Sequence, residues 1–451
     1  MIRWSAVLAL GALAFAAAAA VPKNPATPGP PALFAIADAV DAARLRATIE
    51  ALVGFGTRHT LSDTQSATRG IGTARRWVQA RFEAIARDCG GCLSVVTPAQ
   101  TFTGKRIPQP AEVMDVVAIQ RGSGDPQRVV IVTGHLDSRA GDVMDATDDA
   151  PGANDDASGV AAVVEAARVL SRYRFRATLV YAALSGEEQG LYGGKVLAGY
   201  AGAQGWQVEA DLNNDIVGNS EGQDGTRETT VVRVFSEGTK SNETPDEAKV
   251  RRYHGGEVDS PSRNIARCMA ALAERYLPNF GVRMVYRTDR YGRSGDQVPF
   301  LEAGYPAVRV TEAHENYTRQ HQDLRSENGV RYGDTIDGVD FAYLANVARL
   351  NAITMAQMAW APAPPSGVDV DGALGTDTIV KWNAVPGADG YRVWWRDTAA
   401  AQWQHSRDAD AQATSLVLKN VVVDDQFFGV SSVSAEGFES PVVFPGAAGA
   451  F

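Results

Sequence analysis

Between residues 34 and 360, short runs of continuous apolar residues alternate with segments of helical spacing. Two of these runs, Val129–Thr133 and Ala177–Leu184, consist of β-branched and other apolar residues and predict fully buried strands. After a polar loop, residues 158–170 place Ala, Val and Leu at helical spacing. Because strands that alternate with helices form layered domains, we predict an α/β three-layer sandwich with a mostly parallel central sheet.

The same two periodicities predict the other elements of this region. The predicted helices cover residues 38–52, 67–85, 190–198, 264–276 and 339–359. The predicted strands cover residues 93–96, 113–121, 208–217, 229–235 and 305–311. Apart from one of these strands, residues 220–261 are rich in Gly, Glu and Arg, which favours loops around a site over a separate domain.

The pattern changes after residue 360. Residues 361–366, with the sequence APAPPS, predict a linker, and residues 367–451 then contain short strands at 378–382, 390–396, 415–418 and 426–434. Trp382 on one strand and the alternating Tyr391, Val393 and Trp395 on the next resemble a fibronectin type III module, which is a seven-stranded sandwich. We therefore expect a catalytic domain at 34–360 and a fibronectin type III-like domain at 367–451.

Residues 1–21 predict a secretory signal peptide. Arg3 precedes an apolar run that ends in small residues suited to cleavage. A retained membrane anchor is the alternative, but the run is short and no second hydrophobic span follows it. We expect a secreted or periplasmic protein without integral membrane association after cleavage.

The three cysteines fit an oxidising destination. Cys89 and Cys92 predict a small disulfide loop, and Cys268 predicts a buried free thiol because it lies in an apolar helical pattern. The formal net charge of −10 argues against nucleic acid as a partner.

Potential metal ligands follow the predicted strands. The first strand leads into His135 and Asp137, and Ala177–Leu184 leads into Glu187 and Glu188. Because ligands bind at the carboxyl ends of strands in α/β sheets, and because His nitrogen and carboxylate oxygen bind zinc, these positions predict a metal site. If the two glutamates lie on an extended segment they point in opposite directions, so that one can bind metal while the other serves as a base.

From the residues alone, several neighbouring positions compete for the same roles. In the loop after the first strand the candidates are Asp148, Asp149, Asp155 and Asp156. At the end of the 208–217 strand they are Asp211, Asn213, Asn214 and Asp215, and in the late loop they are His314 and His321.

Four motifs occur in a fixed order: HLDS at 135–138, GANDDASG at 152–159, SGEEQGLYG at 185–193 and NNDIVG at 213–218, followed by a late histidine. In this order they resemble the secreted di-zinc aminopeptidases of the family that also includes glutamate carboxypeptidase II and glutaminyl cyclases. The resemblance covers residues 34–360.

The resemblance implies a specific set of site residues. His135 and Asp215 would hold one zinc ion, Glu188 and His321 would hold the second, and Asp155 would bridge the two. Glu187 would be the general base and acid, and Asp137 would orient the site. The family also implies a cis peptide bond between Asp155 and Asp156.

The expected function is hydrolysis of the N-terminal residue from peptides with a free N-terminus. A glutaminyl cyclase or a metallo-carboxypeptidase on the same fold is the alternative, and a binding protein that has lost its metals is a third possibility. One position departs from the family: Gln320 stands where many members place the Tyr that polarises the substrate carbonyl. Tyr317 is close enough in sequence to replace it, and Asp296, in the loop 290–299, is expected to orient its neighbours.

Overall fold

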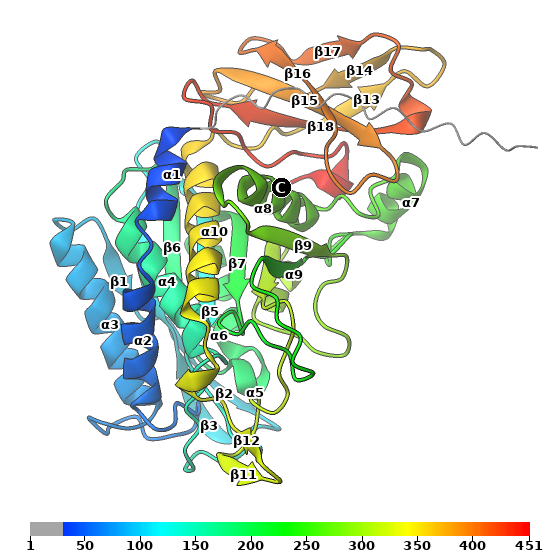
Figure 1. Ribbon diagram of the computed structural model, residues 1–451. Coiled ribbons are helices and arrows are strands. Elements are labelled where there is room, and N and C mark those ends of the chain that lie inside the picture. The colour runs from blue at the N-terminus through cyan, green and yellow to red at the C-terminus, as the bar shows by residue number, and fades with distance from the viewer. Residues whose placement is uncertain (1–29) are drawn as a thin grey trace, which may run out of the picture.

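The computed structural model describes residues 30–451; the predicted signal peptide at 1–21 lies outside them. Eight strands form the central sheet in the order β1-β4-β6-β5-β7-β10-β8-β9 (Figure 1). They are β1 (Ser94–Val96), β4 (Val116–Gln120), β5 (Asp125–His135), β6 (Ala177–Leu184), β7 (Gln207–Asn214), β8 (Val231–Phe235), β9 (Gly281–Val285) and β10 (Ala307–Thr311). The central strands β6, β5, β7 and β10 are parallel, which confirms the predicted α/β class.

Helices cover both faces of the sheet. One face packs against α1 (Pro31–Asp38), α2 (Ala42–Val53), α3 (Ile71–Asp88), α4 (Ala157–Leu170), α8 (Pro261–Tyr276) and α10 (Phe341–Trp360). The other face packs against α6 (Tyr192–Ala203) and α9 (Gln297–Glu302). No helix within residues 30–451 is long and apolar enough to cross a lipid bilayer.

The side chains of β5 explain why its apolar run is continuous. Val130 and Val132 belong to the core on the α4 side, whereas Val129 and Ile131 belong to the core on the α6 side. Successive side chains of a strand point to opposite faces, so a strand covered by helices on both sides needs apolar residues at every position.

Some predicted boundaries were wrong. The helix predicted at 38–52 is α2, which begins only at Ala42 because the Asp41 side chain accepts a hydrogen bond from Ala43 N and caps the helix. The strand predicted at 113–121 is divided at Asp115, whose buried carboxylate accepts a hydrogen bond from Ser185 N at 2.9 Å.

Elements with little apolar periodicity were not predicted. The elements missed are the hairpin β2 (Ala99–Gly104) and β3 (Ile107–Met114), the hairpin β11 (Arg325–Glu327) and β12 (Val330–Tyr332), the strands β9, β13 (Asp369–Asp371) and β16 (His405–Asp410), the helices α1, α5 (Glu187–Gly190), α7 (Pro245–His254) and α9, and the 3₁₀ turns η1 (Ile336–Gly338), η2 (Val423–Asp425) and η3 (Ala447–Gly449). Helix α7 has no buried residue and begins instead with a capping box of Thr244 and Glu247.

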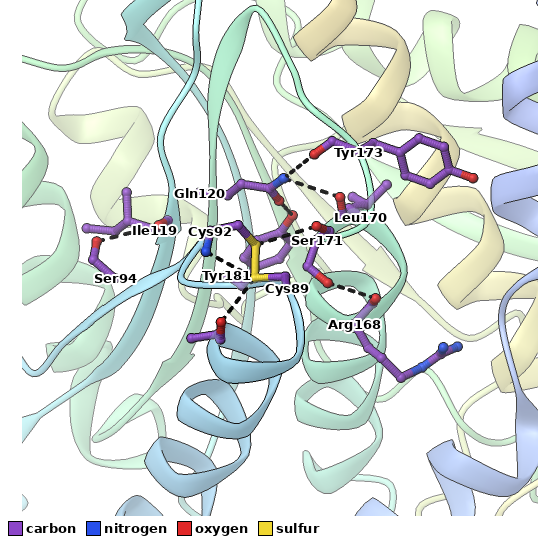
Figure 2. The surroundings of a disulfide bond; sticks show 11 residues. Cys89, Cys92, Ser94, Ile119, Gln120, Arg168, Leu170, Ser171, Tyr173 and Tyr181 are labelled. Carbon is purple, nitrogen blue, oxygen red and sulfur yellow. Dashed lines mark hydrogen bonds between the residues drawn. A yellow bond between two sulfur atoms is a disulfide. The ribbon is translucent and has the colours of Figure 1, made fainter.

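The predicted disulfide is present. Cys89 and Cys92 are joined with a Cα–Cα distance of 5.6 Å, where α3 ends and the chain turns toward β1 (Figure 2). Gly90 and Gly91 both have positive φ, at 71° and 85°, which suits the tight turn between the two cysteines. Cys268 is free, as expected, but it is only half buried.

After residue 366 the chain forms two three-stranded antiparallel sheets. One contains β13 (Asp369–Asp371), β14 (Thr378–Lys381) and β17 (Ser415–Leu418), and the other contains β16 (His405–Asp410), β15 (Gly390–Asp397) and β18 (Gln426–Val433). Trp382, Tyr391 and Val393 lie in the core between them. We refer to these residues as the C-terminal sandwich; its assignment to the fibronectin type III class stays a prediction.

The C-terminal sandwich packs against the end of the catalytic domain at which β6 begins (Figure 1). Arg176, directly before β6, donates hydrogen bonds to Pro386 O and Gly387 O at 2.7 and 3.1 Å. Trp360, the last residue of α10, stacks on Phe438 with the ring centroids 4.7 Å apart.

A buried ion triad joins the two domains. Asp259 of the catalytic domain accepts hydrogen bonds from Arg267 of α8 at 2.8 Å and from Arg396 of β15 at 2.8 and 2.9 Å. All three side chains are at most 2% exposed. Because both guanidinium groups share one carboxylate, its loss leaves two buried cations without their counter-charge.

We expect Asp259→Asn to lower the free energy of unfolding by about 3–5 kcal/mol, the usual cost of breaking a buried ion pair. Thermal and denaturant unfolding followed by circular dichroism measure this change. Asp377→Asn is the matched control, because it removes the exposed Lys419–Asp377 pair and should cost about 1 kcal/mol or less. Equal stability of the two variants would show that the triad does not hold the domains together.

Candidate metal centre

The predicted site residues meet at the carboxyl edge of the central sheet. His135 is the last residue of β5, Asp215 directly follows β7, and Glu188 lies in α5 just after β6. Because β6, β5 and β7 are parallel neighbours, their carboxyl ends bring these side chains to the same place. Asp155 reaches it from the loop before α4, and His321 from the loop after β10.

These five side chains form two groups that share Asp155. In the first group, Nε2 of His135 lies 3.0 Å from Oδ1 of Asp155 and 3.9 Å from Oδ1 of Asp215. In the second, Nε2 of His321 lies 3.1 Å from Oδ2 of Asp155 and 3.0 Å from Oε1 of Glu188. Within each group all potential ligand atoms lie within 4.8 Å of one another. Asp155 therefore presents one oxygen to each group.

The unpartnered atoms of the centre fit a bound metal. Nε2 of His135 and Oε1 of Glu188 are buried and have no hydrogen-bond partner among the described residues. Native proteins seldom leave buried polar atoms unpaired, because each one costs stability. A cation between these atoms and the other carboxylates would give both of them a partner, and imidazole nitrogen with carboxylate oxygen is a donor set that suits zinc.

The charge balance of the centre also favours a cation. Burial alone would lower the pKa of His321, but the negative charges of Glu188 and Asp155 raise it to about 10. Burial likewise opposes protonation of His135, and the carboxylates around it, including Asp137, raise its pKa well above the ordinary value. The surrounding carboxylates therefore favour positive charge at both imidazoles, and a divalent cation bound between these groups can supply that charge in place of protons.

Asp137 organises the centre from behind. Its buried carboxylate accepts hydrogen bonds from Thr60 Oγ1 at 2.9 Å and from the backbone nitrogens of Glu187 and Glu188, both at 3.2 Å. Nδ1 of His135 lies 3.0 Å from the Asp137 backbone oxygen and 3.7 Å from its Oδ1. Because Nδ1 faces two acceptors it carries the ring proton, which leaves the Nε2 lone pair for a metal.

The structure separates Asp155 from its rivals. Asp156 turns away from the other ligands: its Oδ1 caps α4 by accepting from Gly159 N, and its Oδ2 accepts from His135 N. The bond between Asp155 and Asp156 is cis, as the family resemblance implies. Asp148 and Asp149 are exposed, and neither belongs to a metal-binding group within residues 30–451.

The competing positions on β7 and in the late loop differ in the same way. Asp211 is buried further back along β7, where it accepts a hydrogen bond from Thr133 Oγ1 at 2.9 Å, and burial raises its pKa well above the ordinary value. Asp215 instead accepts a hydrogen bond from Arg309 Nη1 at 2.5 Å. His314 belongs to neither of the two groups found in the described part of the chain.

Glu187 and Glu188 diverge for a different reason than we expected. They occupy the first turn of α5 and not an extended segment, so the helix itself points their side chains in different directions. Glu188 joins the second group, whereas Glu187 is half buried and receives no side-chain hydrogen bond from the described residues. Burial, strengthened by the negative charge of Glu188, raises the pKa of Glu187 well above the ordinary value.

The loop residues expected near the substrate lie as follows. Tyr317 is 56% exposed and lines a hollow with His314 and Arg233, and none of the five potential ligands lines it. Gln320 is buried, with Oε1 3.5 Å from Arg293 Nη2. Asp296 is buried and accepts a hydrogen bond from Gly194 N, so it orients a neighbour as expected.

Sequence reasoning missed the charged residues that hold the loops beneath the centre. Asp334 accepts hydrogen bonds from the backbone nitrogens of Asn154 and Asp155, and burial raises its pKa to about 7. Arg58 is fully buried and donates to the carbonyl oxygens of Leu136, Pro151 and Gly152. Single charged residues in loops have no periodicity, so no sequence signal distinguished them from solvated ones.

The family described as peptidase family M28 matches residues 115–336. A relative from Leptosphaeria maculans named "Probable zinc metalloprotease" is 45% identical over 416 residues, which cover 91% of this chain and 96% of the relative. A relative of the same name from Pyrenophora teres f. teres is 42% identical over 426 residues, which cover 93% of this chain and 88% of the relative.

A solved structure has the same fold. The crystal structure of the Legionella pneumophila LapA aminopeptidase covers 72% of this chain and 74% of its own, with a TM-score of 0.51 and 19% identity. At that identity the similarity concerns the fold alone. The two relatives align with nearly the whole chain, and they confirm the family that the four motifs predicted: the chain belongs to peptidase family M28.

Proposed function

We propose that the chain is a zinc-dependent aminopeptidase that acts on peptides outside the cytoplasm and holds two zinc ions. The observation that carries this proposal is the pair of metal-binding groups that share Asp155. His135, Asp155 and Asp215 would hold one ion, and Asp155, Glu188 and His321 would hold the other. The relatives named zinc metalloproteases support the choice of metal. The predicted signal peptide supports the location.

Bound zinc would supply polarisation of the scissile carbonyl and a lowered pKa for a nucleophilic water. Glu187 is the residue that moves the proton. Glu187 is the neighbour of Glu188 in α5, and its carboxylate accepts no hydrogen bond from the described residues. It can accept the proton of the attacking water and then donate that proton to the leaving amine. Asp137 keeps Glu187 in place through the hydrogen bond from the Glu187 backbone nitrogen.

Release of free amino acids from a peptide panel tests this function. The panel contains unblocked and N-acetylated peptides, peptides blocked at the C-terminus, and a peptide with N-terminal Gln. We expect hydrolysis of the unblocked and C-terminally blocked peptides only, loss of activity after dialysis against a chelator, and recovery when zinc is returned.

Two outcomes would move the function elsewhere. Cleavage that requires a free C-terminus would indicate a metallo-carboxypeptidase. Cyclisation of N-terminal Gln without hydrolysis, together with one zinc ion per chain, would indicate a glutaminyl cyclase. The family resemblance leaves both of these activities open.

The adjacent glutamates give a matched pair of variants. We expect Glu187→Gln to lower kcat by about 10²- to 10⁴-fold, the usual contribution of a general base, while the zinc content stays at two ions per chain. Glu188→Gln should lower the zinc content itself, because it removes a ligand. Kinetics together with elemental analysis of the purified variants separate the two effects. A Glu187→Gln enzyme with nearly normal kcat would exclude it as the base.

A further inference from the structure

The two metal-binding groups lie in different electrostatic surroundings. On the side of the first group, Arg309 Nη1 donates a hydrogen bond to Oδ2 of Asp215 at 2.5 Å. A second guanidinium, that of Arg290, has Nη2 4.0 Å from the same oxygen. Asp215 therefore already shares its negative charge with cations of the protein.

Among residues 30–451, no arginine or lysine donates a hydrogen bond to the Glu188 carboxylate. Arg139 Nη1 lies 3.8 Å from its Oε2, and Arg106 Nη1 donates instead to the Glu188 backbone oxygen at 2.7 Å. Oε1 of Glu188 lies 3.0 Å from Nε2 of His321, the other ligand candidate of this group, and accepts no hydrogen bond from the described residues. The negative charge of Glu188 is thus available to a metal ion. The second group is also the more exposed one, because the His321 side chain is 32% exposed.

Arg309 cannot leave Asp215. It lies on β10, and its side chain is 0% exposed. A Cβ atom on Gly295 would come within 2.4 Å of its Nη1, so the loop before α9 encloses the guanidinium closely. The same Nη1 also lies 3.7 Å from Oδ2 of Asp289, so a second carboxylate helps to hold the guanidinium. The positive charge at Asp215 is therefore a fixed property of the centre.

We propose that Arg309 makes the site of His135, Asp155 and Asp215 the weaker of the two metal sites, so that the site of Asp155, Glu188 and His321 fills first. This inference rests on the proposed binding of two zinc ions. A cation bonded to a ligand carboxylate repels the metal and withdraws electron density from the ligand, and both effects weaken binding. Arg309 is in this sense a positioning residue, because it acts on the metal through Asp215.

The position of Asp215 does not depend on Arg309. Asp215 directly follows β7, and its backbone nitrogen donates a hydrogen bond to Val310 O at 3.2 Å. Its side chain is also buried among the other ligands. Replacement of Arg309 thus removes a charge while the ligand stays in place, and we expect the weaker site to bind zinc more tightly.

Stepwise zinc titration of the full-length, metal-free protein by calorimetry tests the proposal. The wild type should show two binding steps. Glu188→Gln should abolish the tighter step and Asp215→Asn the weaker one. Arg309→Met should tighten the weaker step by about 10- to 100-fold, because a unit positive charge a few ångströms from the ion repels it by an amount of that order, and so bring the two steps together.

Two further variants serve as controls. Arg309→Lys keeps the positive charge, so its weaker step should stay close to that of the wild type. Arg139→Met removes the cation near Glu188 and should leave the weaker step unchanged. Cobalt absorbance provides a second readout that does not depend on activity, and circular dichroism checks that each variant is folded.

The outcomes are distinct. A wild type that binds fewer than two zinc ions would contradict the proposed function. A wild type that binds two ions in equivalent steps, or fills the His135 side first, would overturn the inference about Arg309 alone. So would a folded Arg309→Met protein whose weaker step is unchanged or weaker still. If Arg309→Met does not fold, a weaker step that tightens in Arg309→Gln supports the proposal, and one that does not overturns it.

Discussion

Repulsion between like charges is the constraint around which this centre is built. Parallel strands direct their carboxyl ends to one edge, and here that edge brings together the buried Asp137, Asp155, Asp215 and Glu188 and the half-buried Glu187. Such a cluster is unstable in a low-dielectric interior unless positive charge and hydrogen-bond donors surround it. Most of the buried polar and charged residues near the site reduce this repulsion.

Backbone hydrogen bonds reduce this repulsion and also fix the geometry of the site. Backbone donors satisfy two carboxylates that belong to neither metal-binding group: Asp137 accepts hydrogen bonds from nitrogens in the first turn of α5, and Asp156 accepts them from nitrogens of β5 and α4. These bonds also tie neighbouring strand ends together, so the same residues that disperse charge fix the ligand positions. The ligand carboxylates keep their charge, which is what a bound cation needs.

Sequence patterns predicted the elements with a regular apolar pattern and the places where polar residues cluster. The continuous apolar runs of β5 and β6 predicted the parallel core, and polar residues at their ends indicated a metal site. The choice of Asp155 and not Asp156 came from family resemblance, because the two are adjacent and only the capping bonds of Asp156 distinguish them.

Contacts between segments far apart in the chain could not be predicted, because they produce no local sequence pattern. Arg309 and Asp215 are 94 residues apart, and Arg396 and Asp259 are 137 apart. Their importance depends on burial and partners that only the folded chain supplies. Hairpins and helices without an apolar face, such as β2–β3 and α7, were not predicted either, because they bury few side chains.

The position of the C-terminal sandwich determines which part of the molecule would stay accessible if the sandwich were bound to a surface. It is fixed by a buried ion triad and by Arg176 to the end of the sheet where β6 begins, whereas the ligands gather where β5, β6 and β7 end (Figure 1). The two therefore occupy opposite poles of one body. A surface that held the sandwich would lie on the side away from the metal-binding groups, and these groups would face the surrounding medium.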